Sequence, residues 1–269
     1  MDELSQIEEF EGIVLSVKKH REQDHLVKIF TDRFGKLMFF TRGTGKRNNK
    51  LKTAILPFTK ATYIGDVRTT WLCFLNDAKD QQQYQSMQTD IFLNAYATYL
   101  LNLTDVALED RQPNHALYHK LAASLQEIDE GSDPEIIMNI FEIQLLPYFG
   151  VAPELRGCRV CGNTEGPFDY SQTYGGLLCQ KHWHMDEHRY HATQRSIYFI
   201  RLFSRVSLDQ IGSISVKEET KKEIQSLVDQ IYDDSVGIKL KSKGFIKKMD
   251  KWGSVLKDAR NPEKNDRKD

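Results

Sequence analysis

The sequence predicts an α+β protein of several domains, and three observations lead to that fold class. Short segments rich in β-branched and aromatic residues occupy about the first eighty positions, helical periodicity follows, and a cluster of cysteine and histidine interrupts the helices. A chain of 269 residues is long for one compact core and suits several smaller ones. We expect a basic barrel at 1–80, a helical domain at 81–156 and 192–258, a zinc-ribbon insertion at 157–191 and a disordered tail at 259–269.

Five short segments of the amino-terminal region have the pattern of β-strands. In the first of them Ile13, Leu15 and Val17 alternate with more polar residues, as a half-buried strand requires. Turn-forming residues separate the segments, and five strands in about seventy residues fit a small closed barrel. The OB-fold is one of the few five-stranded solutions, and an SH3-like barrel fits the same pattern. The expected strands are 12–19, 25–31, 36–42, 58–65 and 71–76.

Helical periodicity begins after residue 80. Across 84–108 mostly apolar residues recur at spacings of three and four, which predicts one amphipathic helix. Asn114 and Asp133 are suitable N-caps for the next two helices, and Pro134 suits a first helical turn. The final residues, DARNPEKNDRKD, have almost nothing to bury, which predicts the disordered tail. Helices are expected at 84–108, 114–128, 134–147, 193–205, 217–235 and 242–257.

The net charge of −1 conceals a strong asymmetry along the chain. Between Gly12 and Lys60 there are twelve Lys or Arg residues and three Asp or Glu residues, a net charge of +9. Between Asp77 and Gly157 there are four basic and thirteen acidic residues, a net charge of −9. The expected barrel is therefore the part of the chain suited to bind an anion.

The sequence gives no indication of export or of a membrane span. No apolar run approaches the roughly 18 residues that a spanning helix needs, and the amino terminus, MDELSQIEEF, is acidic where a signal peptide is basic and then apolar. We therefore expect a cytoplasmic protein without a membrane partner, in which the four cysteines are reduced. Cys73 lies alone in an apolar strand and is expected to belong to the core.

The other three cysteines form a metal-binding pattern with a histidine. Cys158 and Cys161 form C-x2-C, and Cys179 and His182 form C-x2-H, so two tight turns can direct four ligands at one tetrahedral centre. Sulfur and imidazole ligands suit Zn²⁺, and four protein ligands leave no open position, which predicts one structural Zn²⁺ in a ribbon with a hairpin at PFDYSQTYGG. His184 is an alternative fourth ligand. A disulfide and an incidental group of buried cysteines are the competing interpretations.

A catalytic alternative overlaps this cluster. Residues 184–188, HMDEH, match H-x-x-E-H, in which two histidines on one helical face hold an open zinc while the glutamate activates water. The alternative is therefore a zinc-dependent hydrolase that uses His184, Glu187 and His188. Such a short match arises easily by chance in a histidine-rich segment, so we favour the closed metal site and a protein that is not an enzyme.

One loop of the basic segment, FFTRGTGKRNNK at 39–50, is a candidate for binding phosphates. A nucleotide-binding loop of the G-x-x-x-x-G-K-[ST] type needs a hydroxyl after its lysine, but Arg47 follows Lys46, and no glycine stands five positions before Gly45. The nucleotide interpretation therefore fails. We expect the backbone of a nucleic acid as the ligand, with Gly43 and Gly45 making the loop flexible.

Basic residues around aromatic rings are the means by which OB-folds bind single strands without reading their sequence. Phe34, Phe39, Phe40 and Tyr63 are candidate aromatic faces, although some of them must belong to the core. The competing interpretations are a solvated charged surface and a protein-adaptor module without DNA binding. The residues expected to bind DNA are Lys18, Lys19, Arg21, Lys36, Arg42, Lys46, Arg47 and Lys50.

In their order along the chain, these segments resemble the RecO family of bacterial recombination mediators. The opening EGIVLSVKKHREQDHLVKIFTDRFGKLMFFTRGTGKRNNK is similar to the family's first strand, second hairpin and following turn. FEIQLLPYFGVAPEL with GCRVCG is similar to its helix-to-zinc junction, GGLLC to its second knuckle and GIKLKSKGFIKKM to its carboxy-terminal pattern. The resemblance spans nearly the whole chain.

The resemblance implies an OB-fold, a helical domain and an inserted zinc ribbon. It also implies binding to single- and double-stranded DNA, annealing of complementary strands and a complex with RecR in the RecFOR pathway of DNA repair and recombination. RecO-like proteins engage the carboxy-terminal tail of single-stranded-DNA-binding protein and help load RecA onto coated DNA, which implies a place at the bacterial nucleoid. The chain departs from the family pattern at His182, where we would expect cysteine, and at Thr41, where alanine is frequent. We expect the second change to matter little.

A basic run near the carboxy terminus has two interpretations. It can extend the DNA-binding surface, or it can receive the acidic tail of single-stranded-DNA-binding protein. A merely solvated helix face is the competing explanation. The residues concerned are Lys239, Lys241, Lys243, Lys247, Lys248 and Lys251.

Overall fold

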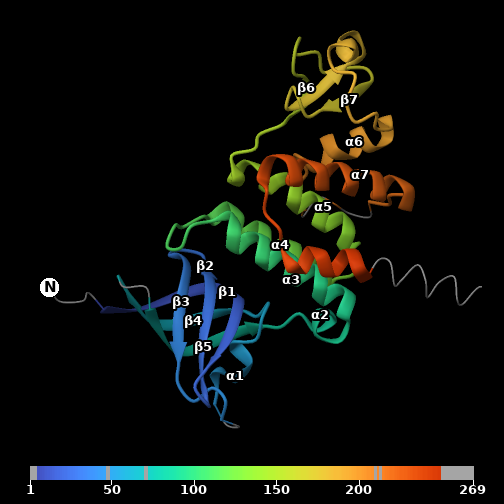
Figure 1. The fold of residues 1–269 in the computed structure, drawn as a ribbon. Coiled ribbons are helices and arrows are strands. Elements are labelled where there is room, and N and C mark those ends of the chain that lie inside the picture. Colours follow the sequence, from blue (N-terminus) through green and yellow to red (C-terminus); the bar gives the residue numbers. More distant parts are fainter. Residues whose placement is uncertain (1–4, 47–48, 70–71, 209–210, 212–213, 250–269) are drawn as a thin grey trace, which may run out of the picture.

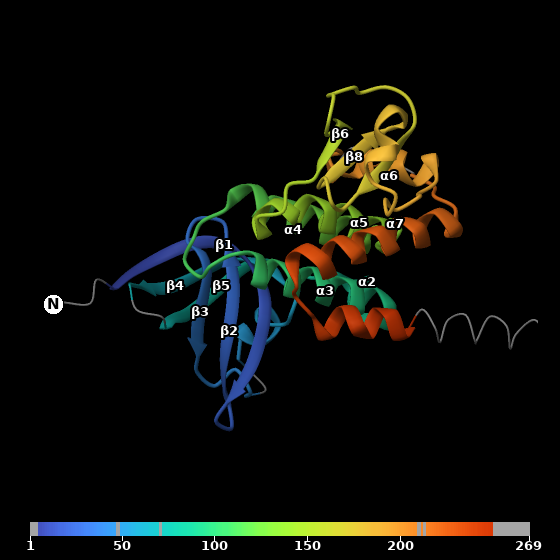
Figure 2. The same cartoon turned by 45° about the horizontal axis from the view of Figure 1, so that its top comes forward.

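The computed structural model describes residues 5–46, 49–69, 72–208, 211 and 214–249. Figures 1 and 2 show a β-barrel and a small β-sheet at opposite ends of a helical domain that lies between them. The expected tail at 259–269 and the last part of the expected helix at 242–257 lie outside the described residues. Within the described residues, no helix is both long enough and apolar enough to cross a bilayer.

Five strands form a closed barrel in the order β1-β2-β3-β5-β4, which confirms the expected five-stranded barrel. Neighbouring strands are antiparallel except β3 and β5, which pair in parallel. This order is the one found in OB-folds, so the SH3-like alternative is wrong. The elements are β1 (Ser5–His20), β2 (Asp24–Thr31), β3 (Gly35–Thr41), α1 (Leu51–Ala54), β4 (Lys60–Arg68) and β5 (Leu72–Gln82).

β1 begins seven residues earlier than expected, because it pairs with two neighbours along its length. Its first part pairs with β4 and its second part with β2, and Gly12 pairs with both. A Cβ at Gly12 would lie 2.5 Å from Ile29 Cγ2, so a side chain does not fit where β1 passes from one neighbour to the other. A register shift between Val14 and Ser16 marks a bulge that bends the strand further.

The barrel encloses an apolar core of its own. The rings of Phe10 and Phe39 stack with centroids 5.4 Å apart, and the Tyr63 hydroxyl donates a hydrogen bond to the Ala54 carbonyl at 2.7 Å. Cys73 is fully buried in the same cluster, as expected. Because Phe39 and Tyr63 are fully buried, neither ring is available for stacking on a base.

The helix expected at 84–108 is in fact two helices, α2 (Gln85–Thr89) and α3 (Ile91–Ala107). Asp90 lies between them with an extended backbone, φ −106° and ψ 116°. Its carboxylate accepts hydrogen bonds from the N–H groups of Phe92 and Leu93, which caps the start of α3. The apolar spacing continues across this single extended residue, so periodicity alone does not reveal the break.

The two helix starts predicted from capping residues are confirmed. Asn114 caps α4 (His115–Asp129), and Asp133 caps α5 (Pro134–Leu145), each by accepting hydrogen bonds from main-chain N–H groups of the first turn. Pro134 occupies the first turn of α5, where its missing N–H costs no helical hydrogen bond.

α5 is the centre of the helical core. All its residues from Ile136 to Ile143 are buried, and it packs against α3, α4, α6 and α7. The remaining elements of this domain are η1 (Leu146–Phe149), α6 (Gln194–Phe203), α7 (Glu218–Ile231), η4 (Tyr232–Val236) and the helical residues 241–249.

The insertion between η1 and α6 is a three-stranded sheet in the order β6-β8-β7. β7 and β8 form the antiparallel hairpin expected from PFDYSQTYGG, and all residues of both strands are buried. β7 packs against α6, which attaches the sheet to the helical domain. The elements are β6 (Glu154–Cys158), β7 (Phe168–Ser171), β8 (Gly176–Cys179) and the 3₁₀ helix η2 (Gln180–Met185).

One face of the barrel packs directly on the helical core. Ile13, Leu15 and Phe30 are buried in the same apolar cluster as the helices. The ring of Phe30 meets the ring of Tyr118 on α4 edge-on, with centroids 5.7 Å apart. The Tyr118 hydroxyl also contacts the Glu11 carboxylate of β1 at 3.4 Å, so apolar and polar contacts join the two domains.

Candidate nucleic-acid interface and metal centre

The β1–β2 turn and the loop after β3 lie against each other. The Gly45 N–H donates to the Gln23 carbonyl at 2.9 Å, and the Gly43 N–H donates to Asp24 Oδ1 at 2.9 Å. These bonds bring together the two basic stretches that the sequence singled out, around Lys19 on β1 and in the loop after Thr41. The barrel therefore joins separate predicted residues into one surface.

The loop after β3 is held in place by its own polar side chains. Thr44 Oγ1 lies 2.7 Å from His25 Nδ1 and 3.0 Å from Thr41 Oγ1, and both threonines are buried. Gly43 has φ +64°, which favours glycine, and a Cβ at Gly45 would lie 3.0 Å from Gln23 Cα. The two glycines thus meet steric requirements of the loop, and the expectation that they also make it flexible stays a prediction.

Six of the eight residues expected to bind DNA lie in the described chain with exposed side chains. They surround the joined turn and loop, so their charges act on one region of the barrel surface. Arg47 lies outside the described residues. The exposed six are Lys18, Lys19, Arg21, Arg42, Lys46 and Lys50.

The expectation that Lys36 binds DNA is wrong. Its side chain is 3% exposed, and its ammonium lies 3.0 Å from Asp105 Oδ1 and 3.3 Å from Asp110 Oδ1. Lys28 Nζ also bonds Asp105 Oδ1, at 2.9 Å. Burial alone would raise the pKa of Asp105, but hydrogen bonds from Lys28 and Lys36 outweigh it and lower that pKa. Lys36 therefore ties the barrel to the end of α3 and does not reach a phosphate.

A groove of about 900 Å³ opens on the barrel between the loop after β3 and the end of β4. Arg42 and Lys50 line it on the loop side, and Arg68 lines it on the β4 side. Phe40 and Phe74, paired in register across β3 and β5, contribute two half-buried rings with centroids 5.9 Å apart. Besides two aspartates, Asp66 and Asp77, the groove thus presents three cations and aromatic surface, the combination that binds single-stranded nucleic acid.

Sequence reasoning missed two residues of this groove, Arg68 and Phe74. The Arg68 guanidinium lies 4.5 Å from the centroid of the Phe74 ring and bonds Asp66 Oδ2 at 2.8 Å. Phe74 stands in a predicted strand, but its place beside Phe40 depends on the β3–β5 pairing of residues far apart in the chain. No local pattern in the sequence could have found that pairing.

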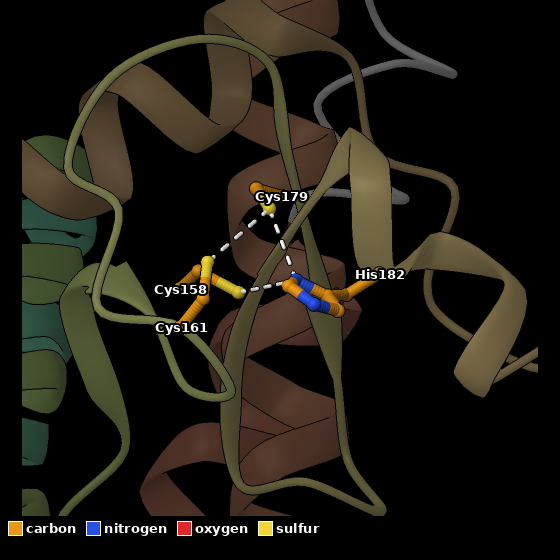
Figure 3. A group of neighbouring side chains, drawn as sticks. All are labelled: Cys158, Cys161, Cys179 and His182. Atoms are coloured by element: carbon orange, nitrogen blue, oxygen red, sulfur yellow. Dashed lines mark hydrogen bonds between the residues drawn. The ribbon is translucent and has the colours of Figure 1, made fainter.

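The metal-binding pattern closes into one cluster. The ligand atoms of Cys158, Cys161, Cys179 and His182 all lie within 4.8 Å of one another, and Figure 3 shows the four side chains converging. Cys161 Sγ lies 3.8 Å from Cys179 Sγ, and His182 Nδ1 lies 3.3 Å from Cys179 Sγ and 3.5 Å from Cys158 Sγ. Tetrahedral zinc with ordinary bond lengths separates such ligands by about 3.5–3.8 Å. These residues therefore fit a closed metal site.

Main-chain hydrogen bonds fix the backbone at Cys158 and favour its thiolate, the form that binds a metal. The Cys158 N–H donates to the Asn163 carbonyl at 2.8 Å, and a Cβ at Gly157 would lie 2.7 Å from that carbonyl oxygen, so glycine is needed there. Burial would raise the pKa of Cys158, but hydrogen bonds from main-chain N–H groups outweigh it and lower the pKa to about 6. Burial and its neighbouring thiols raise the pKa of Cys179.

The open choice between two histidines is resolved by position, because His182 and not His184 lies in the cluster. The H-x-x-E-H segment also lacks the helix that a hydrolase of that type requires. η2 ends at Met185, and Asp186 has an extended backbone with φ −144° and ψ 103°. Asp186 Oδ1 accepts a hydrogen bond from the His188 N–H at 2.9 Å, which shapes a turn. His184 and His188 therefore do not share one helical face.

Two lysines of the carboxy-terminal basic run form ion pairs within the helical domain. Lys243 Nζ bonds the buried Glu142 carboxylate at 2.7 Å, and Lys247 Nζ bonds Asp229 Oδ2 at 2.8 Å. Lys251 lies outside the described residues. These ion pairs hold the helical residues 241–249 against α5 and α7, and the remaining exposed residues of the run are Lys239, Lys241 and Lys248.

Comparison with known proteins agrees with the resemblance noted in the sequence. Residues 4–84 match the family described as Recombination protein O N terminal, and residues 88–244 match Recombination protein O C terminal. DNA repair protein RecO of Enterococcus faecalis (strain ATCC 700802 / V583) is 54% identical over 249 residues, which cover 93% of this chain and 95% of that protein.

Two further relatives carry the same description. DNA repair protein RecO of Latilactobacillus sakei subsp. sakei is 53% identical over 249 residues, covering 93% of this chain and 92% of that protein. The protein of that name from Levilactobacillus brevis is 46% identical over 251 residues, covering 93% of this chain and 96% of its own length. With both family matches and this coverage, the chain belongs to the RecO family of DNA repair proteins.

Proposed function

We propose that this protein is a non-enzymatic mediator of DNA repair and homologous recombination that binds single- and double-stranded DNA through its barrel. The observation that carries the proposal is the groove in which Arg42, Lys50 and Arg68 border the rings of Phe40 and Phe74. The arginine and lysine side chains would contact phosphates, and the two rings would stack on bases. Each stacked base contributes about 1–3 kcal/mol to binding of this kind.

Strand annealing follows from the same surface. Two complementary strands repel each other through their phosphates, and a basic surface that neutralises part of this charge lets them approach. Contacts to phosphates and ring faces leave the base-pairing edges free. The exposed cluster from Lys18 to Lys50 therefore supports annealing without sequence preference.

We propose that the metal held by Cys158, Cys161, Cys179 and His182 is one structural Zn²⁺. The thiolate and imidazole ligands suit zinc, and four protein ligands leave no position for a reacting water. The ribbon is small, so metal binding would supply much of its folding free energy. This role agrees with a protein that carries out no chemistry of its own.

A second groove supports binding of an acidic partner tail, the role that the family resemblance gives to single-stranded-DNA-binding protein. Its volume is about 910 Å³, and it lies between α4, the start of β6 and the residues after α6. Lys120, Arg156 and Arg205 border apolar lining residues such as Ile143 and Leu155. Cations around an apolar floor suit a peptide that ends in acidic residues.

Changing Arg156 and Arg205 to alanine should weaken binding of an acidic carboxy-terminal peptide at least several-fold, because both cations are exposed at this groove. Fluorescence anisotropy with a labelled peptide measures the effect. Unchanged peptide affinity would exclude this groove as the binding site for the peptide.

We also propose association with RecR, loading of RecA and a location at the nucleoid. These three proposals rest on the family resemblance alone.

Changing Arg42 and Lys50 together to alanine tests the DNA-binding proposal. The slope of log affinity for single-stranded DNA against log salt should become shallower by about 1.4 for two lost phosphate contacts. Titration of a labelled oligonucleotide between about 50 and 200 mM salt measures it. The matched control changes Lys217 and Lys222, two exposed lysines at α7, and should leave the slope unchanged. Equal slopes in all three proteins would show that the groove does not bind DNA.

A further inference from the structure

The segment that joins α3 to α4 lies against the barrel and extends its surface. The Arg111 N–H donates to the Lys36 carbonyl at 3.0 Å, and Asp110 forms a parallel bridge with Lys36. A Cβ at Gly35 would lie 2.4 Å from the Gln112 carbonyl oxygen, so the two main chains approach as closely as glycine allows. The helical domain therefore reaches the barrel through main-chain contacts as well as through ion pairs.

Arg111 holds an unusual conformation at this contact. Its φ is +65°, in the left-handed region that side chains other than glycine rarely adopt. This backbone conformation directs the guanidinium under the end of β4, where Nη1 donates to the Arg68 carbonyl at 2.8 Å. Nη2 lies 3.8 Å from Cys73 Sγ, the same sulfur that accepts the Arg68 N–H at 3.4 Å.

The residue held in this way has its side chain in the DNA groove. Arg68 is the last residue of β4, and its guanidinium lies over the Phe74 ring and bonds Asp66 within the groove. The Arg111 guanidinium thus bonds the main chain of Arg68 on the side that faces the helical domain. The Arg68 side chain lines the groove on the opposite side. The guanidinium of Arg111 does not line the groove itself.

We propose that Arg111 is a positioning residue for the DNA groove: by fixing the main chain at Arg68, it makes the groove geometry depend on how the helical domain docks on the barrel. The inference rests on the proposed DNA-binding function of that groove. Without the Arg111 bond, the end of β4 has more conformations to lose when DNA orders it, so binding weakens. A partner that shifts the α3–α4 segment would then change DNA affinity without touching DNA.

The test replaces Arg111 with glycine in the full chain. Glycine adopts φ near +65° without strain and keeps the N–H bond to Lys36, so any fall in melting temperature should be small and come only from the lost bonds to Arg68 and Cys73. Affinity for a single-stranded oligonucleotide at fixed salt should fall roughly three- to tenfold, within the range of coupling between contacting residues. Arg111→Lys keeps a donor for the Arg68 carbonyl and should recover part of the lost affinity.

A double-mutant cycle separates positioning from direct contact. If Arg111 acts through Arg68, then Arg111→Gly should have little further effect on affinity in an Arg68→Ala background. Arg21→Gly is the matched comparison, because Arg21 also has a positive φ, +57°, but is exposed in the β1–β2 turn away from Arg68. Its loss of affinity should add fully to that of Arg68→Ala.

Three results would overturn the inference while leaving the DNA groove in place. The first is unchanged affinity in Arg111→Gly while Arg68→Ala binds more weakly, and the second is full additivity of these two substitutions. The third is a loss of affinity in Arg111→Gly that is accompanied by a large fall in melting temperature and is not recovered at all in Arg111→Lys. If Arg68→Ala and the Arg42 and Lys50 double variant both bind normally, the groove itself is excluded, and the inference falls with it.

Discussion

At the scale of single residues, environment decides what a polar side chain does in this barrel. Thr41 is fully buried, and its hydroxyl contacts Thr44 Oγ1 at 3.0 Å and the His25 carbonyl at 3.3 Å. These bonds shape the start of the loop that carries Arg42 and Lys46. The expectation that threonine in place of alanine matters little therefore conflicts with the contacts that the hydroxyl makes.

Replacing Thr41 with valine should lower the free energy of unfolding by about 1 kcal/mol, because the methyl group keeps the volume but removes buried hydrogen bonds. Urea unfolding followed by circular dichroism measures the change. Thr53→Val is the control, since the Thr53 hydroxyl bonds Gln81 at the surface and its loss should cost less. Equal stability of wild type and Thr41→Val would show that the hydroxyl contributes nothing.

The roles of the charged residues Lys36 and Arg42 also depend on their environment. Both are basic residues in or just after β3, and the sequence gives no reason to separate them. Lys36 is buried between two aspartates that lie about seventy residues further along the chain, whereas Arg42 is exposed at the groove. Long-range pairing removes one of the two cations from the interface.

At the scale of elements, the ribbon that carries the Cys158, Cys161, Cys179 and His182 cluster shows which parts of a metal site a local sequence pattern predicts. Its ligands come from two tight turns, so the three cysteines were predictable from the sequence, and His182 was the favoured fourth ligand with His184 as its alternative. The sequence did not decide between the two histidines, because C-x2-H and C-x4-H are both sterically possible. The turn of η2 decides the choice by directing His182 toward the three sulfurs.

If the cluster holds the proposed Zn²⁺, His182→Ala should lower the zinc content and make the ribbon sensitive to protease, since the metal would supply much of the ribbon's folding free energy. His184→Ala is the matched control and should keep zinc at the wild-type level. Metal content by mass spectrometry and limited proteolysis measure both effects. Because the barrel lies at the opposite end of the molecule, DNA affinity should change little in either variant (Figure 1). Loss of zinc in His184→Ala instead would contradict the assigned ligand set.

At the scale of the whole molecule, ion pairs join the barrel to the helical domain. Asp105 at the end of α3 bonds Lys28 and Lys36, and hydrogen bonds from these lysines lower its pKa below the ordinary 3.8 despite burial. A carboxyl whose pKa falls on folding stabilises the fold above its unfolded pKa. That contribution is lost as the pH falls through the lower, folded value.

Asp105→Asn should therefore be less stable than wild type near neutral pH, on the order of 2 kcal/mol, because the buried Lys36 loses one of its two carboxylate partners and keeps Asp110 and the Asp105 main-chain carbonyl. The difference should shrink as the pH is lowered below the ordinary aspartate pKa of 3.8 and through the lower pKa of Asp105 in the folded protein, where Asp105 itself becomes protonated. Denaturant titrations of both proteins across this range measure the difference. A gap that stays constant with pH would show that Asp105 does not carry the effect.

Much of the fold was predictable because its signals are local. Alternation in β1–β5, the caps Asn114 and Asp133 and the hairpin of β7 and β8 depend on neighbours a few residues apart. The break at Asp90 was missed because one extended residue does not disturb a spacing of three and four. Two of the five residues that define the proposed groove were missed for a different reason, since Arg68 and Phe74 join it only through pairing between distant strands.

The sequence by itself determined the basic character of the barrel, the five strands, the helix caps and three of the four metal ligands. Each of these follows from residue type and from spacings of a few residues, and neither depends on how distant parts of the chain pack together. Only the tertiary structure decided that Lys36 is a buried anchor, that His182 completes the metal cluster, and that Phe40 meets Phe74 in a groove bordered by Arg68. These outcomes depend on which distant segments share a surface, because burial and pairing set what a charged or aromatic side chain can still contact.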